Sequence, residues 1–196
     1  MNALDVAKRA ALASNMRFPG EKDLRAFGLQ KQDELYSMIC YLMLSPPTRV
    51  LEVGSAAGGT FLAWCACATD DAVIVSVDIN QFDPDQELME SYAKADQSVH
   101  FVRGDSHASE TKQQVQEICN EFDFLFIDAD HSEIAVRADW KDYSPLVESG
   151  GFVGFHDICD GGPIGDLWKE LAHDYPNIKF IQNENDGWGG IGVLKV

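Results

Sequence analysis

Residues Val50 to Thr60 read Val-Leu-Glu-Val-Gly-Ser-Ala-Ala-Gly-Gly-Thr. This stretch predicts a buried strand, a turn of small residues and then a helix, so that backbone N–H groups can approach a ligand closely. Ala56 takes the second glycine position of the dinucleotide fingerprint G-x-G-x-x-G, and no Gly-Lys-Ser/Thr of a P-loop follows. Glu52 would repel a pyrophosphate and suits a ligand with a positive group. The alternative is a tight strand–helix turn with no ligand.

Apolar runs rich in β-branched and aromatic residues recur along the chain, with helical patterns between them. Several runs are continuously apolar, as in parallel strands that are covered on both faces. We expect strands at Arg49–Val53, Ala72–Val77, His100–Arg103, Phe122–Ile127, Phe152–Phe155, Ile178–Gln182 and Ile191–Val196. Only a polar, glycine-containing turn separates the last two, which should form an antiparallel hairpin at one side of the sheet. The pattern predicts an α/β fold: a doubly wound, mostly parallel seven-stranded sheet with an antiparallel C-terminal hairpin.

Composition excludes several classes of function. The 196 residues correspond to about one domain, and 32 acids against 15 Lys and Arg give a formal net charge of -17. That charge argues against non-specific nucleic-acid binding and against docking on an anionic membrane. The first residues lack the apolar stretch of a signal peptide, and the five cysteines show no CxxC spacing. We therefore expect a cytoplasmic protein with free thiols.

Acids or histidines also follow the next four expected strands. They are Asp78, the pair Asp105 and Ser106, the stretch Asp128–His131, and the pair His156 and Asp157. Ligands of open α/β sheets bind beyond the carboxyl ends of the strands, so these side chains should gather at one edge. An acid such as Asp78, about 20 residues after a glycine turn, commonly receives the ribose hydroxyls of a nucleoside. Any one of these residues could instead be a helix N-cap.

The ordered set resembles the class I S-adenosylmethionine (SAM)-dependent methyltransferases, specifically small O-methyltransferases of the catechol and caffeoyl-CoA type. The resemblance runs from about Lys31 to Val196 and includes the glycine turn, Asp78, Gly104-Asp105-Ser106, Phe126–His131 and the strand that ends in His156-Asp157. It implies a Rossmann-like fold, SAM as cofactor, and transfer of a methyl group to an oxygen of a small hydroxylated metabolite.

The resemblance also implies roles for the residues at the strand ends. Glu52 and the glycine turn would hold the methionine end of the cofactor and Asp78 the ribose hydroxyls. Asp105 and Ser106 would lie near the adenine, and Asp128 near the sulfonium. The full set of expected cofactor contacts is Glu52, Gly54, Ser55, Ala56, Gly58, Gly59, Thr60, Asp78, Ile79, Asp105, Ser106 and Asp128.

Metal-dependent relatives bind a divalent cation through an acid in the position of Asp128 and an Asp-Asn pair, where this chain has His156-Asp157. A cation on Asp128, His156 and Asp157 would have mixed ligands that suit Mn, Fe or Zn better than Mg. The alternative is a site without metal.

The general base is a separate question. His131 stands where plant relatives carry a lysine thought to act as the base, and it is the first candidate for that role, with His156 second. The other histidines, His100, His107 and His173, are expected at surface or capping positions.

We expect one methyltransferase domain over residues 1–196, with 1–30 as an N-terminal helical cap segment and 31–196 as the SAM-binding core. The cap segment and the loop Cys159–Gly165 would shape the pocket for a small-molecule acceptor. The acceptor's identity stays open, as does the choice between monomer and homodimer. Two other readings are a catalytically idle domain that binds a nucleoside or a partner, and an NAD-dependent oxidoreductase. The missing fingerprint and the terminal hairpin argue against the second.

Overall fold

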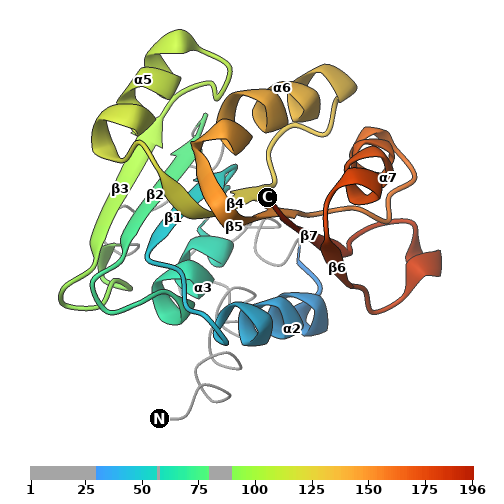
Figure 1. Ribbon diagram of the computed structural model, residues 1–196, viewed down its shortest axis with the longest axis horizontal. Coiled ribbons are helices and arrows are strands. Elements are labelled where there is room, and N and C mark those ends of the chain that lie inside the picture. The colour runs from blue at the N-terminus through green and yellow to red at the C-terminus, as the bar shows by residue number, and fades with distance from the viewer. Residues whose placement is uncertain (1–29, 57, 80–89) are drawn as a thin grey trace, which may run out of the picture.

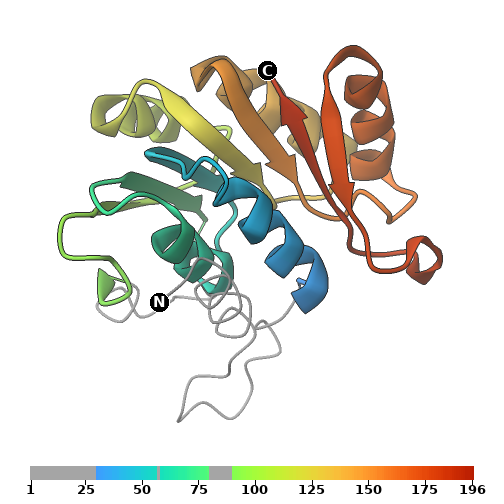
Figure 2. The same cartoon turned by 60° about the horizontal axis from the view of Figure 1, so that its bottom comes forward.

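The computed structural model describes residues 30–56, 58–79 and 90–196, which form a seven-stranded sheet with helices on both faces (Figures 1 and 2). The strands are β1 Arg49–Val53, β2 Val73–Asp78, β3 Ser98–Arg103, β4 Phe122–Ile127, β5 Val147–Phe155, β6 Asn177–Phe180 and β7 Ile191–Lys195. Their order is β3-β2-β1-β4-β5-β7-β6. Strands β1 to β5 are parallel, and β7 pairs antiparallel with both β5 and β6. The predicted fold class and the C-terminal hairpin are confirmed.

The helices divide between the two faces of the sheet. One face carries α2 Gln32–Leu42 and α3 Gly59–Cys67, and the other carries α5 Ser109–Ile118, α6 Glu133–Tyr143 and α7 Pro163–Asp174 (Figure 2). Two short 3₁₀ turns, Ser144–Leu146 and Glu184–Asp186, lie in connections. Among the residues described, no helix is long and apolar enough to cross a membrane. The expected cap segment lies outside the described residues, except for Gln30.

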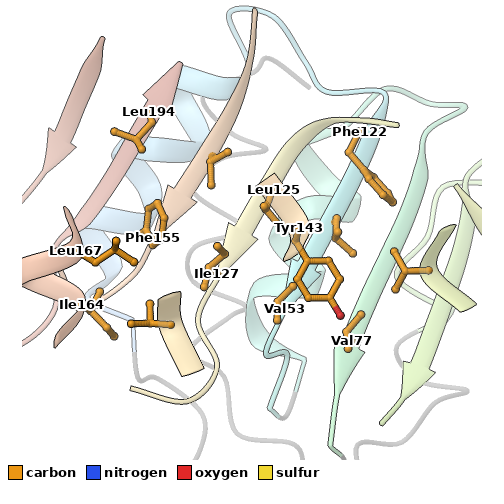
Figure 3. Close-up of a cluster of buried hydrophobic side chains, with 14 of the residues drawn as sticks. Val53, Val77, Phe122, Leu125, Ile127, Tyr143, Phe155, Ile164, Leu167 and Leu194 are labelled. Carbon is orange, nitrogen blue, oxygen red and sulfur yellow. The ribbon is translucent and has the colours of Figure 1, made fainter. Parts of the chain in front are cut away.

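Alternation along the strands splits the core into two apolar clusters. In β1, Val50 packs in the cluster under α2 and α3, whereas Leu51 and Val53 face the cluster under α5, α6 and α7. Figure 3 shows the second cluster, in which Val53, Leu125 and Ile127 lie near Tyr143 of α6. Fully burying one such apolar side chain contributes about 1.5–3 kcal/mol to the stability of the fold. The two clusters therefore stabilise the sheet on both of its faces.

Two strands begin earlier than the apolar runs predict. β3 starts at Ser98 and β5 at Val147, before the expected His100 and Phe152. The added part of β5 is Val-Glu-Ser-Gly-Gly, which has no apolar pattern, and the pairing of β5 with β4 contains a register irregularity between Phe122 and Phe124. Backbone pairing therefore extends this strand where its side chains give no signal.

The topology fixes where a ligand can bind. The strand order reverses between β1 and β4, and the carboxyl ends of β1 to β5 point to the same edge. In doubly wound sheets the crevice at this switch point is the usual ligand site.

Candidate active site

A cavity of about 760 Å³ opens at the carboxyl edge of the sheet. Its lining comes from the ends of all five parallel strands and from two loops. The lining residues are Val53, Gly54, Ala56, Val77, Asp78, Ile79, Gly104, Asp105, Ser106, His107, Asp128, Ala129, Asp130, His131, His156, Asp157, Asp160 and Trp188. The strand-end residues that the sequence pointed to are thus brought together.

The glycine turn packs directly on the end of β4. Gly54 has a φ of +92°, and a Cβ there would lie 2.2 Å from the carbonyl oxygen of Asp128. The Gly54 N–H donates to Val77 O at 2.8 Å, and the Asp128 N–H donates to Val53 O at 2.9 Å. Only glycine has both the backbone freedom and the missing side chain for this close approach. The turn forms one wall of the cavity.

Asp78 closes this turn from the neighbouring strand. Its Oδ2 accepts hydrogen bonds from the backbone N–H groups of Ser55 at 3.1 Å and Ala56 at 2.8 Å. The carboxylate also lines the cavity, so it can face a ligand while it holds the turn. Ser55 contributes its backbone N–H here and is not itself a lining residue.

Glu52 lies beneath the turn and does not reach the cavity. It is fully buried, and its Oε1 accepts hydrogen bonds from Thr60 Oγ1 and, at 2.7 Å, from Trp64 Nε1. Its Oε2 accepts one from Ser76 Oγ at 2.8 Å. Burial raises the pKa of Glu52 to about 7, and the three donors limit the rise. The polar atoms of Glu52 and the Thr60 hydroxyl bond to each other beneath the turn, and their contact with a cofactor stays a prediction.

The expected cofactor set therefore falls into two parts. Gly54, Ala56, Asp78, Ile79, Asp105, Ser106 and Asp128 line the cavity. Glu52, Ser55, Gly58, Gly59 and Thr60 do not. Gly58 precedes α3 with a φ of +83°, and the helix starts at Gly59 without a side-chain cap. Contact of these five residues with a cofactor stays a prediction.

Two carboxylates and two imidazoles meet at the ends of β4 and β5. His156 Nδ1 lies 3.3 Å from Asp128 Oδ1 and 3.0 Å from Asp157 Oδ2. His131 Nε2 lies 3.9 Å and 3.5 Å from the same two oxygens. The His156 side chain is 1% exposed and that of His131 is 47% exposed. The cluster joins a buried imidazole to an accessible one.

The charges in this cluster shift one another's pKa values. Burial alone would lower the pKa of His156, but the carboxylates of Asp128 and Asp157 outweigh it and raise the pKa to about 10. The neighbouring carboxylates of Asp128 and Asp157 raise the pKa of His131 despite partial burial. Burial would raise the pKa values of both acids, and the imidazoles outweigh it and lower them. Without a bound cation, His156 is therefore an imidazolium near neutral pH.

The donor atoms fit a divalent cation. One ligand atom each of Asp128, His131 and Asp157 lies within 4.8 Å of the others. The two ring nitrogens of His156 are buried and make no hydrogen bond within the described part of the chain. Two carboxylates with one or two imidazoles form a mixed oxygen–nitrogen set, which suits Mn, Fe or Zn. The converging set contains His131, whereas the sequence predicted His156 beside Asp128 and Asp157, and that predicted group stays a prediction.

Sequence reasoning missed the role of His107. We expected a surface or capping position, whereas it lines the cavity with ring nitrogens 3.2 Å from both Asp105 and Asp139. Asp139 of α6 is fully buried and also accepts the Ser106 hydroxyl at 2.8 Å. Burial raises the pKa of Asp139. The sequence holds one signal for this position, because Asp139 is a carboxylate on the apolar stripe of a helix and therefore needs a polar partner.

Three further residues around the site come from loops. Asp160 and Trp188 line the cavity, and Gln30 Nε2 donates to Asp128 Oδ2 at 2.6 Å. Trp188 stands in a polar, glycine-rich segment where no periodicity marks it. Their positions depend on long-range loop contacts, which strand-end reasoning does not cover.

Comparisons with known proteins identify the family. The family model described as "Methyltransferase domain" matches residues 51–158, more than half of the chain. The chain therefore belongs to the methyltransferase domain family. No curated protein matches it in sequence.

Solved structures share its Rossmann-like methyltransferase fold. The chain is similar to the O-methyltransferase from Bacillus cereus in complex with SAH, with 16% identity and a TM-score of 0.62 over 99% of this chain and 90% of that one. It is similar to TomG from Streptomyces achromogenes in complex with SAM, with 17% identity and a TM-score of 0.61 over 100% and 90%. MycE of the mycinamycin pathway, in complex with Mg and SAH, shows 18% identity and a TM-score of 0.59 over 99% and 54%.

Proposed function

We propose that the protein transfers the methyl group of SAM to a hydroxyl oxygen of a small molecule. The observation that carries this proposal is one cavity in which a glycine turn closed by Asp78 faces the cluster of Asp128, His131, His156 and Asp157. The turn with Asp78 fits a nucleoside cofactor, and the cluster of carboxylates and imidazoles fits deprotonation of an acceptor. Membership of the methyltransferase family supports the same reading.

The residues around the glycine turn form the end of the cavity that we assign to the cofactor. SAM, when bound, supplies the methyl group and a sulfur leaving group. Asp78 can accept the ribose hydroxyls, and the exposed side chain of Ile79 offers an apolar surface to the adenine. Asp105 and Ser106 lie at the same end of the lining. The carboxylate of Asp128 suits the positive sulfonium.

In this proposal His131 is the general base. Half of its side chain is accessible, so a ring nitrogen can take the proton of the acceptor hydroxyl as the oxygen attacks the methyl group. Asp157 Oδ2, 3.5 Å from Nε2, stabilises the resulting imidazolium. His156 is buried and already protonated near neutral pH, so it orients the two carboxylates and does not act as the base. The transfer itself is an in-line displacement that depends on alignment.

A second version of the site, with a cation, is favoured by the convergence of Asp128, His131 and Asp157. A divalent cation, when bound, supplies a positive charge that stabilises the negative charge on the acceptor oxygen. In that version His131 or His156 is a neutral ligand, and His131 does not act as the base when it is the ligand.

The acceptor side is formed by loops. Asp160, in the loop before α7, and Trp188 line it, and Gln30 donates a hydrogen bond to Asp128. We propose a small-molecule acceptor, in line with the net charge of -17, which disfavours nucleic acid. MycE has been crystallised with Mg, SAH and mycinamycin VI. Five unpaired cysteines support a cytoplasmic location.

Incubation with methyl-labelled SAM and a panel of catechols, phenols and hydroxylated sugars tests the proposal. We expect labelled product and stoichiometric SAH with at least one member of the panel. Binding of SAH with no turnover on any acceptor would favour the catalytically idle domain, and binding of NAD in place of SAH would favour the oxidoreductase.

Exhaustive chelation separates the two versions of the site. If a cation is required, chelation abolishes turnover, and Mn, Fe or Zn restores it better than Mg, because Mg prefers an all-oxygen octahedral shell. Asp157→Ala should then mimic chelation and leave SAH affinity intact. Full activity after chelation, with no metal by elemental analysis, assigns deprotonation to His131 alone.

A further inference from the structure

A buried carboxylate on α2, far from the strand ends in sequence, holds the segment that follows β6. Glu34 is 2% exposed. Its Oε1 accepts a hydrogen bond from the Gln182 N–H at 2.8 Å, and its Oε2 accepts one from the Gly190 N–H at 2.7 Å. A buried carboxylate with two backbone donors is a strong local restraint, since charge-assisted hydrogen bonds are about twice as strong as neutral ones. The mechanism proposed above does not use Glu34.

The same segment holds Asp157. The Gly189 N–H donates to Asp157 Oδ1 at 2.7 Å, while the adjacent Gly190 N–H points at Glu34. Backbone bonds from Cys159 N to Gly189 O at 2.9 Å and from Ile158 N to Gly190 O at 3.2 Å tie the segment to the residues after Asp157. The two glycines thus lie between two carboxylates, one on each side.

This arrangement requires glycine at both positions. Gly189 and Gly190 have φ values of +75° and +79°. A Cβ at Gly190 would lie 2.5 Å from Cys159 Sγ, and a Cβ at Gly189 would lie 3.2 Å from Glu34 Oε2. The conformation that directs successive N–H groups to opposite carboxylates is one that other residues rarely adopt.

Asp157 itself has an unfavourable backbone conformation, with a φ of +58°. Residues without glycine's freedom keep such a conformation only when their surroundings impose it. Here the Gly189 N–H restrains Oδ1, which leaves Oδ2 facing His156 at 3.0 Å and His131 at 3.5 Å. The orientation of the Asp157 carboxylate therefore depends on the two glycines.

We propose that Glu34 is a positioning residue for the acceptor side of the site, acting through Gly189 and Gly190 on Asp157. This inference rests on the proposed function in that it takes Asp157 to serve the acceptor. Lys31, one turn earlier on the same side of α2, bonds Asp186 at 2.8 Å and lies 4.6 Å from the ring centroid of Trp188. The start of α2 thus restrains both the carboxylate and the aromatic ring on this side of the cavity.

The test uses Glu34→Ala and Glu34→Gln, with Asp33→Asn as the matched control on the same helix. Asp33 is exposed and contacts the same segment only through the Gln182 side chain, at 3.4 Å. Three properties are measured: NMR hydrogen exchange of the Gly189 and Gly190 amides, the imidazole signals of His156, and SAH affinity by calorimetry.

In Glu34→Ala we expect exchange at both glycine amides to accelerate about tenfold or more and the His156 signals to shift. SAH affinity should stay within about twofold of that of the native chain, because the cofactor end is formed by other elements. Glu34→Gln keeps one acceptor oxygen and should show a smaller effect, and Asp33→Asn should show none.

Unchanged exchange and unchanged His156 signals in folded Glu34→Ala would overturn the inference. So would a loss of exchange protection spread evenly over β1 and β4 together with weaker SAH binding, because that pattern reports a general role in the fold. If Glu34→Ala fails to fold, the same criteria apply to Glu34→Gln. Failure of the native chain to bind SAH would contradict the proposed function instead, and the exchange and imidazole measurements would still decide the role of Glu34.

Discussion

A carboxyl group with no exposed surface makes the stability of this protein depend on pH. Burial raises the pKa of Glu52 from 4.5 to about 7. Between these values Glu52 loses its proton in the unfolded chain and keeps it in the folded one, so stability falls as pH rises through this window. Above the folded pKa the loss is complete, at about 3 kcal/mol.

Glu52→Gln should remove this dependence while keeping the size of the side chain. When the pH is raised from about 5.5 to 8, the unfolding free energy of the native chain should fall by about 2 kcal/mol relative to that of Glu52→Gln. Urea titration of both proteins at both pH values measures this difference. Parallel pH profiles for the two proteins would show that Glu52 is ionised throughout and would contradict the assigned pKa.

His131 offers the clearest catalytic test. With the acceptor found by the methyl-transfer panel, His131→Ala should lower kcat about 10²- to 10⁴-fold and leave SAH affinity nearly unchanged. Because the base must be deprotonated and its pKa is raised, the activity of the native chain should rise with pH through a value above 6.5. Near-native turnover of the variant at every pH would remove His131 from the mechanism, both as the base and as a cation ligand.

At the scale of elements, the close approach of the glycine turn to β4 can be tested with two glycines of matched conformation. Gly54 and Gly150 have φ values of +92° and +91°, but a Cβ at Gly150 would meet nothing within 4 Å. Gly150→Ala should therefore cost only the backbone strain, about 1 kcal/mol. Gly54→Ala adds a clash with Asp128 O at 2.2 Å and should cost several times more.

The measurements are urea unfolding and SAH calorimetry on both variants. Gly54→Ala should also lose SAH binding at temperatures where it remains folded, whereas Gly150→Ala should keep it. Equal destabilisation of the two variants would show that the turn tolerates a side chain and that its contact with β4 is loose.

The sequence predicts elements well where side chains carry the signal. The strand Phe122–Ile127 is found at its predicted bounds, because both of its faces are apolar. The start of β5 carries no apolar signal, because backbone bonds with Val196 hold Gly150 and Gly151 and an ion pair with Arg49 holds Glu148. The positions of Asp78, Asp128 and Asp157 after parallel strands also predict that they lie together, and all three line one cavity.

Spacing along the chain does not predict the direction of a side chain or a contact between residues far apart in sequence. The spacing places Glu52 near the glycine turn, but only the structure shows that alternation along β1 turns its side chain under α3, toward Thr60 and Trp64. Trp188 was missed, because its place at the cavity depends on a loop held by α2. Neither fact follows from spacing along the chain.

At the scale of the whole molecule, the sheet separates the two apolar clusters and leaves its carboxyl edge for chemistry. Acidic side chains dominate that edge, where Asp78, Asp105, Asp128, Asp130, Asp157 and Asp160 all line the cavity. A cationic cofactor suits such a lining, whereas an anionic dinucleotide does not. The charge of the site thus agrees with the class of ligand that the family implies.

Binding of the SAM-type cofactor in this cavity through Asp78 can be measured by calorimetric titration with SAH. The comparison is between the native chain, Asp78→Asn and the control Asp71→Asn, which alters an exposed acid before the same strand. A lost hydrogen bond to a charged group costs roughly 1.5–3 kcal/mol, so affinity should fall about ten- to a hundredfold in Asp78→Asn and stay unchanged in Asp71→Asn. Equal SAH affinity in all three proteins, or no binding to the native chain, would contradict the account.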